Sequence, residues 1–265
     1  MNPISFVFFF TAFAACVVGK LCGMGGGVII KPVLDAFGIL SVGTINFLAG
    51  CTVLGMTCWS VGKAAFHGTA DIDFRRSTSL ALGAALGGVL GKRLYTLVAA
   101  NLADADMAGG VQACILFAAT FGTLIYTLQK ERIAAHRVSS GIICCGIGLV
   151  LGILGAFLGI GGGPFNMAVL YYFFAMPTKI AAQNSLYIIL FSQAAGLLQM
   201  LLTRQIPPFS ISVLTGMVLC GVAGSEIGEV INRKLTDHIV TRLFECSMAL
   251  ILCVNLYNMW RCLLR

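Results

Sequence analysis

Long apolar runs, separated by short polar connectors, make up most of this chain. A run of about 20 apolar residues is long enough for a helix to cross a bilayer. Runs of that length lie roughly at residues 3–22, 44–62, 77–98, 108–128, 139–159, 182–202, 209–231 and 239–260. The pattern predicts an all-α, multi-pass integral membrane protein with about eight spans.

Two shorter apolar stretches, 28–37 and 165–176, each follow a group of glycines. We call these groups the first glycine break (Gly23, Gly25, Gly26 and Gly27) and the second glycine break (Gly159, Gly161, Gly162 and Gly163). Glycine weakens a helix, and inside a bilayer an unwound backbone is tolerated only where it is buried in protein or lines a cavity. We therefore expect a broken helix, with a half-helix or re-entrant segment, at each group.

The two glycine breaks belong to an internal repeat. The segment that starts at Gly19 (GKLCGMGGGVIIKPVL) matches the one that starts at Gly155 (GAFLGIGGGPFNMAVL), at an offset of 155 − 19 = 136. Asn46 matches Asn184 at a similar offset, 184 − 46 = 138. Two broken helices in equivalent halves point to the binding site of a transporter.

The most polar connector falls between the two matching segments. We place an inter-repeat linker there, at 130–138, which predicts a first transmembrane repeat over 1–129 and a second over 139–265. Repeats that cross the membrane an even number of times are parallel, and an odd number makes them inverted. The pattern alone leaves that parity open.

A helix that begins directly after a glycine break can bind an anion. Its first backbone N–H groups have no partners within the helix, and the helix dipole places partial positive charge at the same end. Pro164 suits the first turn of such a helix, whereas Pro32 predicts a kink. The expected substrate-binding residues are the glycines of both breaks, together with Asn46, Asn166, Asn184 and Ser185.

A different interpretation is that the glycine breaks only allow helices to cross closely, as small residues do in many membrane proteins. Asn46 and Asn184 would then bond neighbouring helices. Three consecutive glycines weaken a helix more than packing requires, and their recurrence in both halves favours a symmetric central site. By contrast, Gly87 and Gly91, which match Gly224 and Gly228, recur every fourth residue and predict close helix packing.

Ionisable residues inside apolar runs are functional candidates. Glu226 and Glu229 lie on the seventh run, and Lys92 and Arg93 lie on the third. The repeat offset of 229 − 92 = 137 pairs Glu229 with Lys92, so we consider these four residues for ion coupling, as a gate or a proton relay. The alternative is that Glu229 pairs with Arg233 one helical turn later.

The composition agrees with a membrane protein and argues against other classes. Hydrophobic residues make up 58% of the chain and charged residues 10%, and the mean hydropathy of +0.95 is too high for a soluble domain. The net charge is +7, but Lys and Arg are scattered between apolar runs, as in loops near lipid headgroups, and do not form a nucleic-acid surface. Their slight excess on the side that would hold both termini predicts cytoplasmic termini.

The 11 cysteines show no C-x-x-C pair and no Cys/His metal spacing, so neither a metal site nor another cofactor is expected. Most lie in apolar runs, where cysteine acts as a small packing residue. Cys22 abuts the first glycine break and is placed where it can meet a substrate. No general base accompanies it and the chain has no P-loop motif, so we expect neither an enzyme nor ATP-driven transport.

The duplicated G-x-G-G-G clusters, Asn46, the pair Asn184-Ser185 and the glycine-spaced third and seventh runs together resemble the TauE/SafE sulfite exporter family, also called the toluene sulfonate uptake permease family. The resemblance covers nearly the whole chain. It implies a multi-pass transporter of sulfur-containing anions, such as sulfite or sulfonates, in a bacterial-type plasma membrane. The chain departs from the family pattern at Ala168, where a proline is usual, and at Phe47, where a serine is usual.

The leading hypothesis is a secondary transporter that exports or takes up a small sulfur-containing anion, bound between the two repeats at the starts of the broken helices. A gradient of H+ or Na+ is the expected energy source, the lipid bilayer the expected surroundings, and a homo-oligomer is compatible with the sequence. A passive anion channel would use the same helix ends with a continuous polar path. A thiol-dependent membrane protein that handles sulfur is the third alternative.

Overall fold

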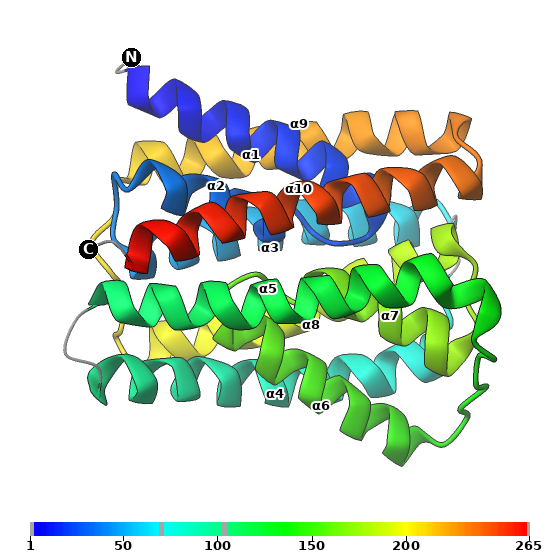
Figure 1. Ribbon diagram of the computed structural model, residues 1–265. Helices are drawn as coiled ribbons and strands as arrows, with labels where there is room; N and C mark the ends of the chain where they lie inside the picture. The colour runs from blue at the N-terminus through cyan, green and yellow to red at the C-terminus, as the bar shows by residue number, and fades with distance from the viewer. Residues whose placement is uncertain (1–2, 69–71, 102–104, 264–265) are drawn as a thin grey trace.

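The computed structural model describes residues 3–68, 72–101 and 105–263 (Figure 1). Within these ranges the chain forms ten α-helices and a 3-10 turn at Lys130–Arg132, with no β-strand, so the all-α prediction is confirmed. The helices are α1 (Pro3–Cys22), α2 (Gly27–Phe37), α3 (Val42–Phe66), α4 (Phe74–Asn101), α5 (Ala105–Gln129), α6 (Gly141–Phe157), α7 (Gly163–Phe174), α8 (Thr178–Leu202), α9 (Ile211–Lys234) and α10 (Asp237–Leu263).

Eight of these helices correspond to the eight long apolar runs. Among the described residues, six helices are long and apolar enough to cross a membrane: α1, α3, α5, α8, α9 and α10. α4 has 28 residues but carries the cationic pairs Arg75–Arg76 and Lys92–Arg93, and α6 is apolar but has 17 residues. The chain is therefore a multi-pass membrane protein, while the number of eight spans stays a prediction.

The chain unwinds at both glycine breaks, as predicted. The first break separates α1 from α2, and the second separates α6 from α7. Gly23 and Gly25 have φ angles of 66° and 67°, and Gly161 and Gly162 have φ angles of 80° and 123°. Glycine enters this left-handed region without the strain that a Cβ would cause. Pro164 lies in the first turn of α7, where its missing N–H leaves no helical hydrogen bond unmade.

Each break folds its two flanking helices into a hairpin. α2 returns towards the end of the bundle where α1 begins, so that Ser5 of α1 lines the same pocket as Ile39. In the other hairpin, the backbone N–H of His136, before α6, donates a hydrogen bond of 2.6 Å to the carbonyl oxygen of Tyr172 in α7. The two hairpins enter the bundle from opposite ends (Figure 1).

The two halves of the chain exchange a helix. α4 packs along α6 and α8 of the second half, and α9 packs along α1 and α3 of the first half (Figure 1). α5 and α10 lie side by side. The fourth helix of each half, α4 or α9, thus contacts the first and third helices of the other half. This arrangement joins the halves into one bundle, in which the start of α1 and the end of α10 lie at the same end (Figure 1).

Glycines make these exchanged contacts close. On α4, a Cβ added to Gly83 or Gly87 would overlap a backbone carbonyl oxygen of α6. On α9, a Cβ added to Gly224 or Gly228 would overlap a backbone carbonyl oxygen of α1. The predicted glycine ridges therefore serve helix packing, as expected where two backbones approach without bulky side chains between them.

Candidate functional site

The starts of α2 and α7 meet near the middle of the bundle. Gly27 lies beside Val53, which is halfway along α3, and a Cβ on Gly27 would be 2.9 Å from the carbonyl oxygen of Ile160. Gly163, at the start of α7, lies against Val28 of α2. Neither helix has a capping side chain at its N-terminus. The positive dipole ends of both half-helices, with their first N–H groups, therefore lie in this central region.

Three buried carboxamides cover the second glycine break, each on one of its glycines: Asn46 on Gly159, Gln193 on Gly161 and Asn166 on Gly162. The three side chains are only 4%, 3% and 1% exposed, in that order. A Cβ on Gly161 would lie 2.5 Å from Nε2 of Gln193, so only glycine leaves room for the amide. In the part of the chain that the structure describes, Oδ1 of Asn46 and Oδ1 of Asn166 have no hydrogen-bond partner. The second break thus holds unsatisfied polar groups at the centre of the bundle.

The first glycine break has a mainly apolar lining. A Cβ on Gly25 would lie 3.3 Å from Cδ1 of Ile189, a tight contact with the end of an apolar side chain. Gly23 packs on the backbone and methyl group of Ala182. Ser185 donates a hydrogen bond of 2.5 Å to the carbonyl oxygen of Gly23, which fastens α8 to the break. This polar contact is satisfied within the protein.

Asn184, the repeat counterpart of Asn46, has a different environment. Its Oδ1 accepts hydrogen bonds from Oγ of Ser77 at 2.5 Å and from the backbone N–H of Asp73 at 3.1 Å. Its Nδ2 donates to the carbonyl oxygen of Ile180 at 2.7 Å. These bonds fasten the start of α4 to α8. The symmetric pair of asparagines expected from the repeat is therefore not found, because Asn46 contacts a glycine break and Asn184 joins two helices.

A pocket of about 460 Å³ opens beside Asn46, at the ends of α4 and α8. Lys92, Tyr95 and Gln199 contribute to its lining. The side chain of Lys92 is buried, and it forms no ion pair with any carboxylate among the described residues. Asn46 contacts both this pocket and the second break, so it connects the two.

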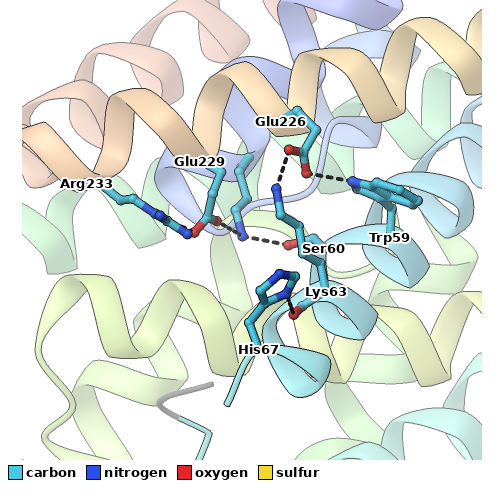
Figure 2. A network of polar contacts seen from close by, with 8 residues as sticks. Trp59, Ser60, Lys63, His67, Glu226, Glu229 and Arg233 are labelled. Carbon is cyan, nitrogen blue, oxygen red and sulfur yellow. Dashed lines mark hydrogen bonds and ion pairs between the residues drawn. The ribbon is translucent and has the colours of Figure 1, made fainter. Parts of the chain in front are cut away.

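A network of charged residues lines a second pocket, of about 210 Å³, at the opposite end of α3 (Figure 2). Nζ of the buried Lys20 lies 2.6 Å from Oε2 of Glu229 and donates a hydrogen bond of 2.6 Å to Oγ of Ser60. Arg233 lies 3.4 Å from the other carboxylate oxygen of Glu229. Lys20 thereby joins the end of α1 to α3 and α9.

A second pair of residues extends this network along α3 and α9 (Figure 2). Lys63 forms an ion pair with Glu226, and Nε1 of Trp59 donates a hydrogen bond of 2.5 Å to the same carboxylate. Lys63 and Glu226 are each about one-third exposed. This outer pair therefore lies in a wetter setting than the pair formed by Lys20.

The structure corrects the expected contact between Glu229 and Lys92. Glu229 pairs with Lys20 and more distantly with Arg233, whereas Lys92 lines the pocket at the other end of α3. Arg93 is exposed on α4. The two positions share the repeat offset of 137, but they line different pockets at opposite ends of α3. The alternative pairing with Arg233 is found, and Lys20 is the nearer partner.

Two residues that contribute to these sites, Gln193 and Lys20, are not among the candidates predicted from the sequence. Gln193 lies 32 positions after Gly161 (193 − 161 = 32), and only the packing of α8 on the second break brings them together. Lys20 could have been predicted as a functional candidate, because it is a lysine inside an apolar run, three positions before Gly23. Cys22 is fully buried within an apolar cluster. The described residues include no group of His, Cys, Asp or Glu able to hold a metal ion.

Comparison with known proteins agrees with this picture of a membrane transporter. The chain is similar to the "Probable membrane transporter protein YunE" of Bacillus subtilis (strain 168), with 24% identity over 271 residues that cover 92% of this chain and 94% of that protein. No solved structure matches this chain. The family model described as "Sulfite exporter TauE/SafE" matches residues 8–256. Because that match spans almost the whole chain, the chain belongs to the TauE/SafE family of membrane transporters.

Proposed function

We propose that this protein is a secondary transporter that carries a small sulfur-containing anion, such as sulfite or an organosulfonate, across the plasma membrane. The description of its family as sulfite exporters supports the substrate class. Two half-helices whose positive ends converge at the centre of a bundle are suited to an anionic substrate group. The glycines there let an oxyanion approach the backbone without a steric barrier.

The observation that carries this proposal is the cluster of carboxamides on the second glycine break. Asn46, Gln193 and Asn166 are neutral, so they can offer hydrogen-bond donors in the bundle without the desolvation cost of a buried charge. A half-turn of an amide exchanges its oxygen and nitrogen, so a side chain with an unpartnered oxygen can present its NH2 group to an anion. The substrate would satisfy groups that lack protein partners.

The arrangement of the chain supports an inverted repeat, with α1 to α5 matching α6 to α10. Each proposed repeat contains one hairpin broken by glycines, and the two hairpins enter from opposite ends (Figure 1). The pockets at Lys92 and at Lys20 lie at opposite ends of α3. Alternating access would open one pocket to the central site while the other is closed, driven by a gradient of H+ or Na+.

Flux into proteoliposomes tests the proposal. Labelled sulfite, thiosulfate, sulfate, methanesulfonate and acetate are compared, with and without an imposed pH or sodium gradient. We expect saturable flux of a sulfur-containing anion. Asn46→Leu should lower it at least about tenfold, because one donor to the anion is lost in a dry site. Asn101→Leu, on the exposed end of α4, is the matched control and should keep wild-type flux.

Three results would count against this function. Wild-type flux in Asn46→Leu would remove the carboxamide site. Flux that rises linearly with concentration and ignores imposed gradients would identify a passive channel. No flux of any tested sulfur-containing anion above that of empty liposomes would remove the substrate class.

A further inference from the structure

The ammonium group of Lys92 is buried without a counter-charge. The side chain is 6% exposed, and within the described residues it has neither an ion pair nor a hydrogen bond. Cys51 and Lys31 lie close enough to interact with it electrostatically, but a neutral thiol and a second cation supply no negative charge. An unpaired buried charge is costly, and a bound anion would offset that cost.

The surroundings of Lys92 are equipped for an oxyanion. Its pocket is also lined by Asn46, Gln199, Tyr95 and Thr96, which all carry hydrogen-bonding groups. Gln199 is 8% exposed, and its Oε1 is buried without a partner in the described part of the chain. A half-turn of this amide exchanges Oε1 and Nε2, so that Gln199 can donate a hydrogen bond to an oxyanion held by the ammonium of Lys92.

Acidic residues do not occupy this pocket. None of its lining residues is an Asp or a Glu. Asp35 of α2 forms an ion pair of 2.9 Å with Lys31, so its charge is matched by that lysine. The pocket is therefore positive, with one cation facing the cavity.

The equivalent position in the other half shows what a matched charge looks like. Glu229 occupies the place on α9 that Lys92 occupies on α4, at the repeat offset of 137 (229 − 92). Glu229 has Lys20 of α1 as its partner at 2.6 Å, whereas the residue of α6 that corresponds to Lys20 is Ala156 (156 − 20 = 136). The charge of Glu229 is thus neutralised by Lys20, whereas the corresponding position for Lys92 is an uncharged alanine.

We infer that the pocket around Lys92 binds the headgroup of a singly charged oxyanion. Lys92 supplies the charge, and Asn46 and Gln199 supply hydrogen bonds. One buried cation neutralises one negative charge, so a dianion such as sulfate would bring an uncompensated charge into the cavity. The lining of the pocket also includes Met200, Ile206 and Pro207, whose apolar side chains can contact an apolar substituent of the anion.

This inference rests on the proposed function and sharpens it. Asn46 contacts both the pocket and the second glycine break, so an anion held at Lys92 lies on the way to the central carboxamides. The pocket would act as the binding site of one open state. Selection by charge would take place there, before the anion reaches the neutral donors of the break.

Equilibrium binding of labelled methanesulfonate to the purified full-length protein in nanodiscs tests the inference without requiring transport. We expect saturable binding to the wild type and at least tenfold weaker competition by sulfate. Lys92→Met should weaken binding at least tenfold, and Lys92→Arg should retain most of it. Gln199→Leu provides a second, independent variant that should also weaken binding. Lys179→Met, at the start of α8 and outside this pocket, should bind as the wild type does.

The outcomes separate the inference from the proposed function. Wild-type binding by Lys92→Met, equal competition by sulfate, or absence of methanesulfonate binding to the wild type would each overturn the inference. Normal saturable flux in Lys92→Met would overturn it too, while leaving the proposed transport intact. Specific binding at Lys92 with no flux of any sulfur-containing anion would support the site and contradict the transport function. Thermal unfolding of each variant separates loss of binding from loss of fold.

Discussion

The two glycine breaks have similar backbones and different surroundings. Both unwind a helix through glycines with positive φ, and both start a half-helix near the centre of the bundle. Around the first break lie Ala182 and Ile189, together with a satisfied hydrogen bond from Ser185. Around the second lie three carboxamides, two of which have an unpartnered oxygen among the described residues. Two similar glycine-broken backbones thus receive different side-chain surroundings from the helices packed against them.

The ends of α1 and α6, the first helices of the two hairpins, also differ in whether nearby charges are paired. α1 ends at an ion pair between Lys20 and Glu229, whereas α6 has Ala156 at the corresponding position, with Lys92 unpaired on α4. The first break is fixed to its neighbours by bonds within the protein. The second break has two carboxamide oxygens that lack a partner among the described residues. We therefore assign anchoring to the first break and substrate contact to the second, and the following changes test that division.

The largest difference is expected between Gly161→Ala and Gly25→Ala. Both glycines have positive φ, of 80° and 67°, so both changes carry a similar backbone strain of about 1–2 kcal/mol. At position 161 the new Cβ also displaces the amide of Gln193, whereas at position 25 it meets Ile189 at 3.3 Å. Misplacing a substrate-contacting group should lower flux about a hundredfold in Gly161→Ala. Proteoliposome flux, normalised to folded protein, is the measurement, and equal losses in the two variants would contradict the division.

The ion pairs at the end of α1 offer a comparison of stability. Glu229→Gln leaves the buried ammonium of Lys20 without its charged partner and should cost about 2 kcal/mol, as for the loss of a hydrogen bond between charged groups. Glu226→Gln removes the partner of the more exposed Lys63 and should cost less than about 1 kcal/mol. Thermal unfolding of the purified variants measures both. A larger fall in Tm for Glu226→Gln would show that the pair at Lys20 does not anchor the first hairpin.

Asn184 and Asn46 are repeat counterparts with different expected roles. Asn184→Ala removes the hydrogen bonds that join α4 to α8 and should destabilise the protein by about 1 kcal/mol, with little change in the KM of the folded fraction. Asn46→Ala should change KM more than Tm. Paired measurements of Tm and KM check this split. The opposite result, a KM raised mainly in Asn184→Ala, would place substrate contact at Asn184 and contradict the role assigned to Asn46.

Ser185→Ala should have the smallest effect. It removes one hydrogen bond, to the carbonyl oxygen of Gly23, which inside a membrane bundle contributes about 0.6 kcal/mol. Flux per folded molecule should stay close to that of the wild type. A loss of flux comparable to that of Asn46→Leu would mean that the first break also contacts the substrate.

Sequence predicted the features that depend on nearby residues. Consecutive glycines in an apolar run predict an unwound helix, and Pro164 predicts the start of the next one, because both effects act through the local backbone. The glycine spacing on α4 and α9 predicts close packing, though not which helix is the partner. The family resemblance was likewise confirmed over residues 8–256.

The asymmetry between the breaks could not be predicted, because it depends on contacts between distant segments. Asn184 is bonded by Ser77, 107 positions away, only because α4 packs on α8. Gln193 reaches Gly161 for a similar reason. The repeat pattern predicted equal roles for Asn46 and Asn184, but side-chain partners follow the packing of helices and not the alignment of the halves.

The most direct test of the account compares isosteric changes at the side chains that face the two breaks. Gln193→Leu removes the amide on Gly161 and keeps its bulk, while Ile189→Leu keeps an apolar side chain opposite Gly25. Saturable flux of sulfite and methanesulfonate is measured for both in proteoliposomes. The account predicts at least about a tenfold loss in Gln193→Leu and near wild-type flux in Ile189→Leu. Wild-type flux in Gln193→Leu, or equal losses in both variants, would contradict substrate binding at the second glycine break.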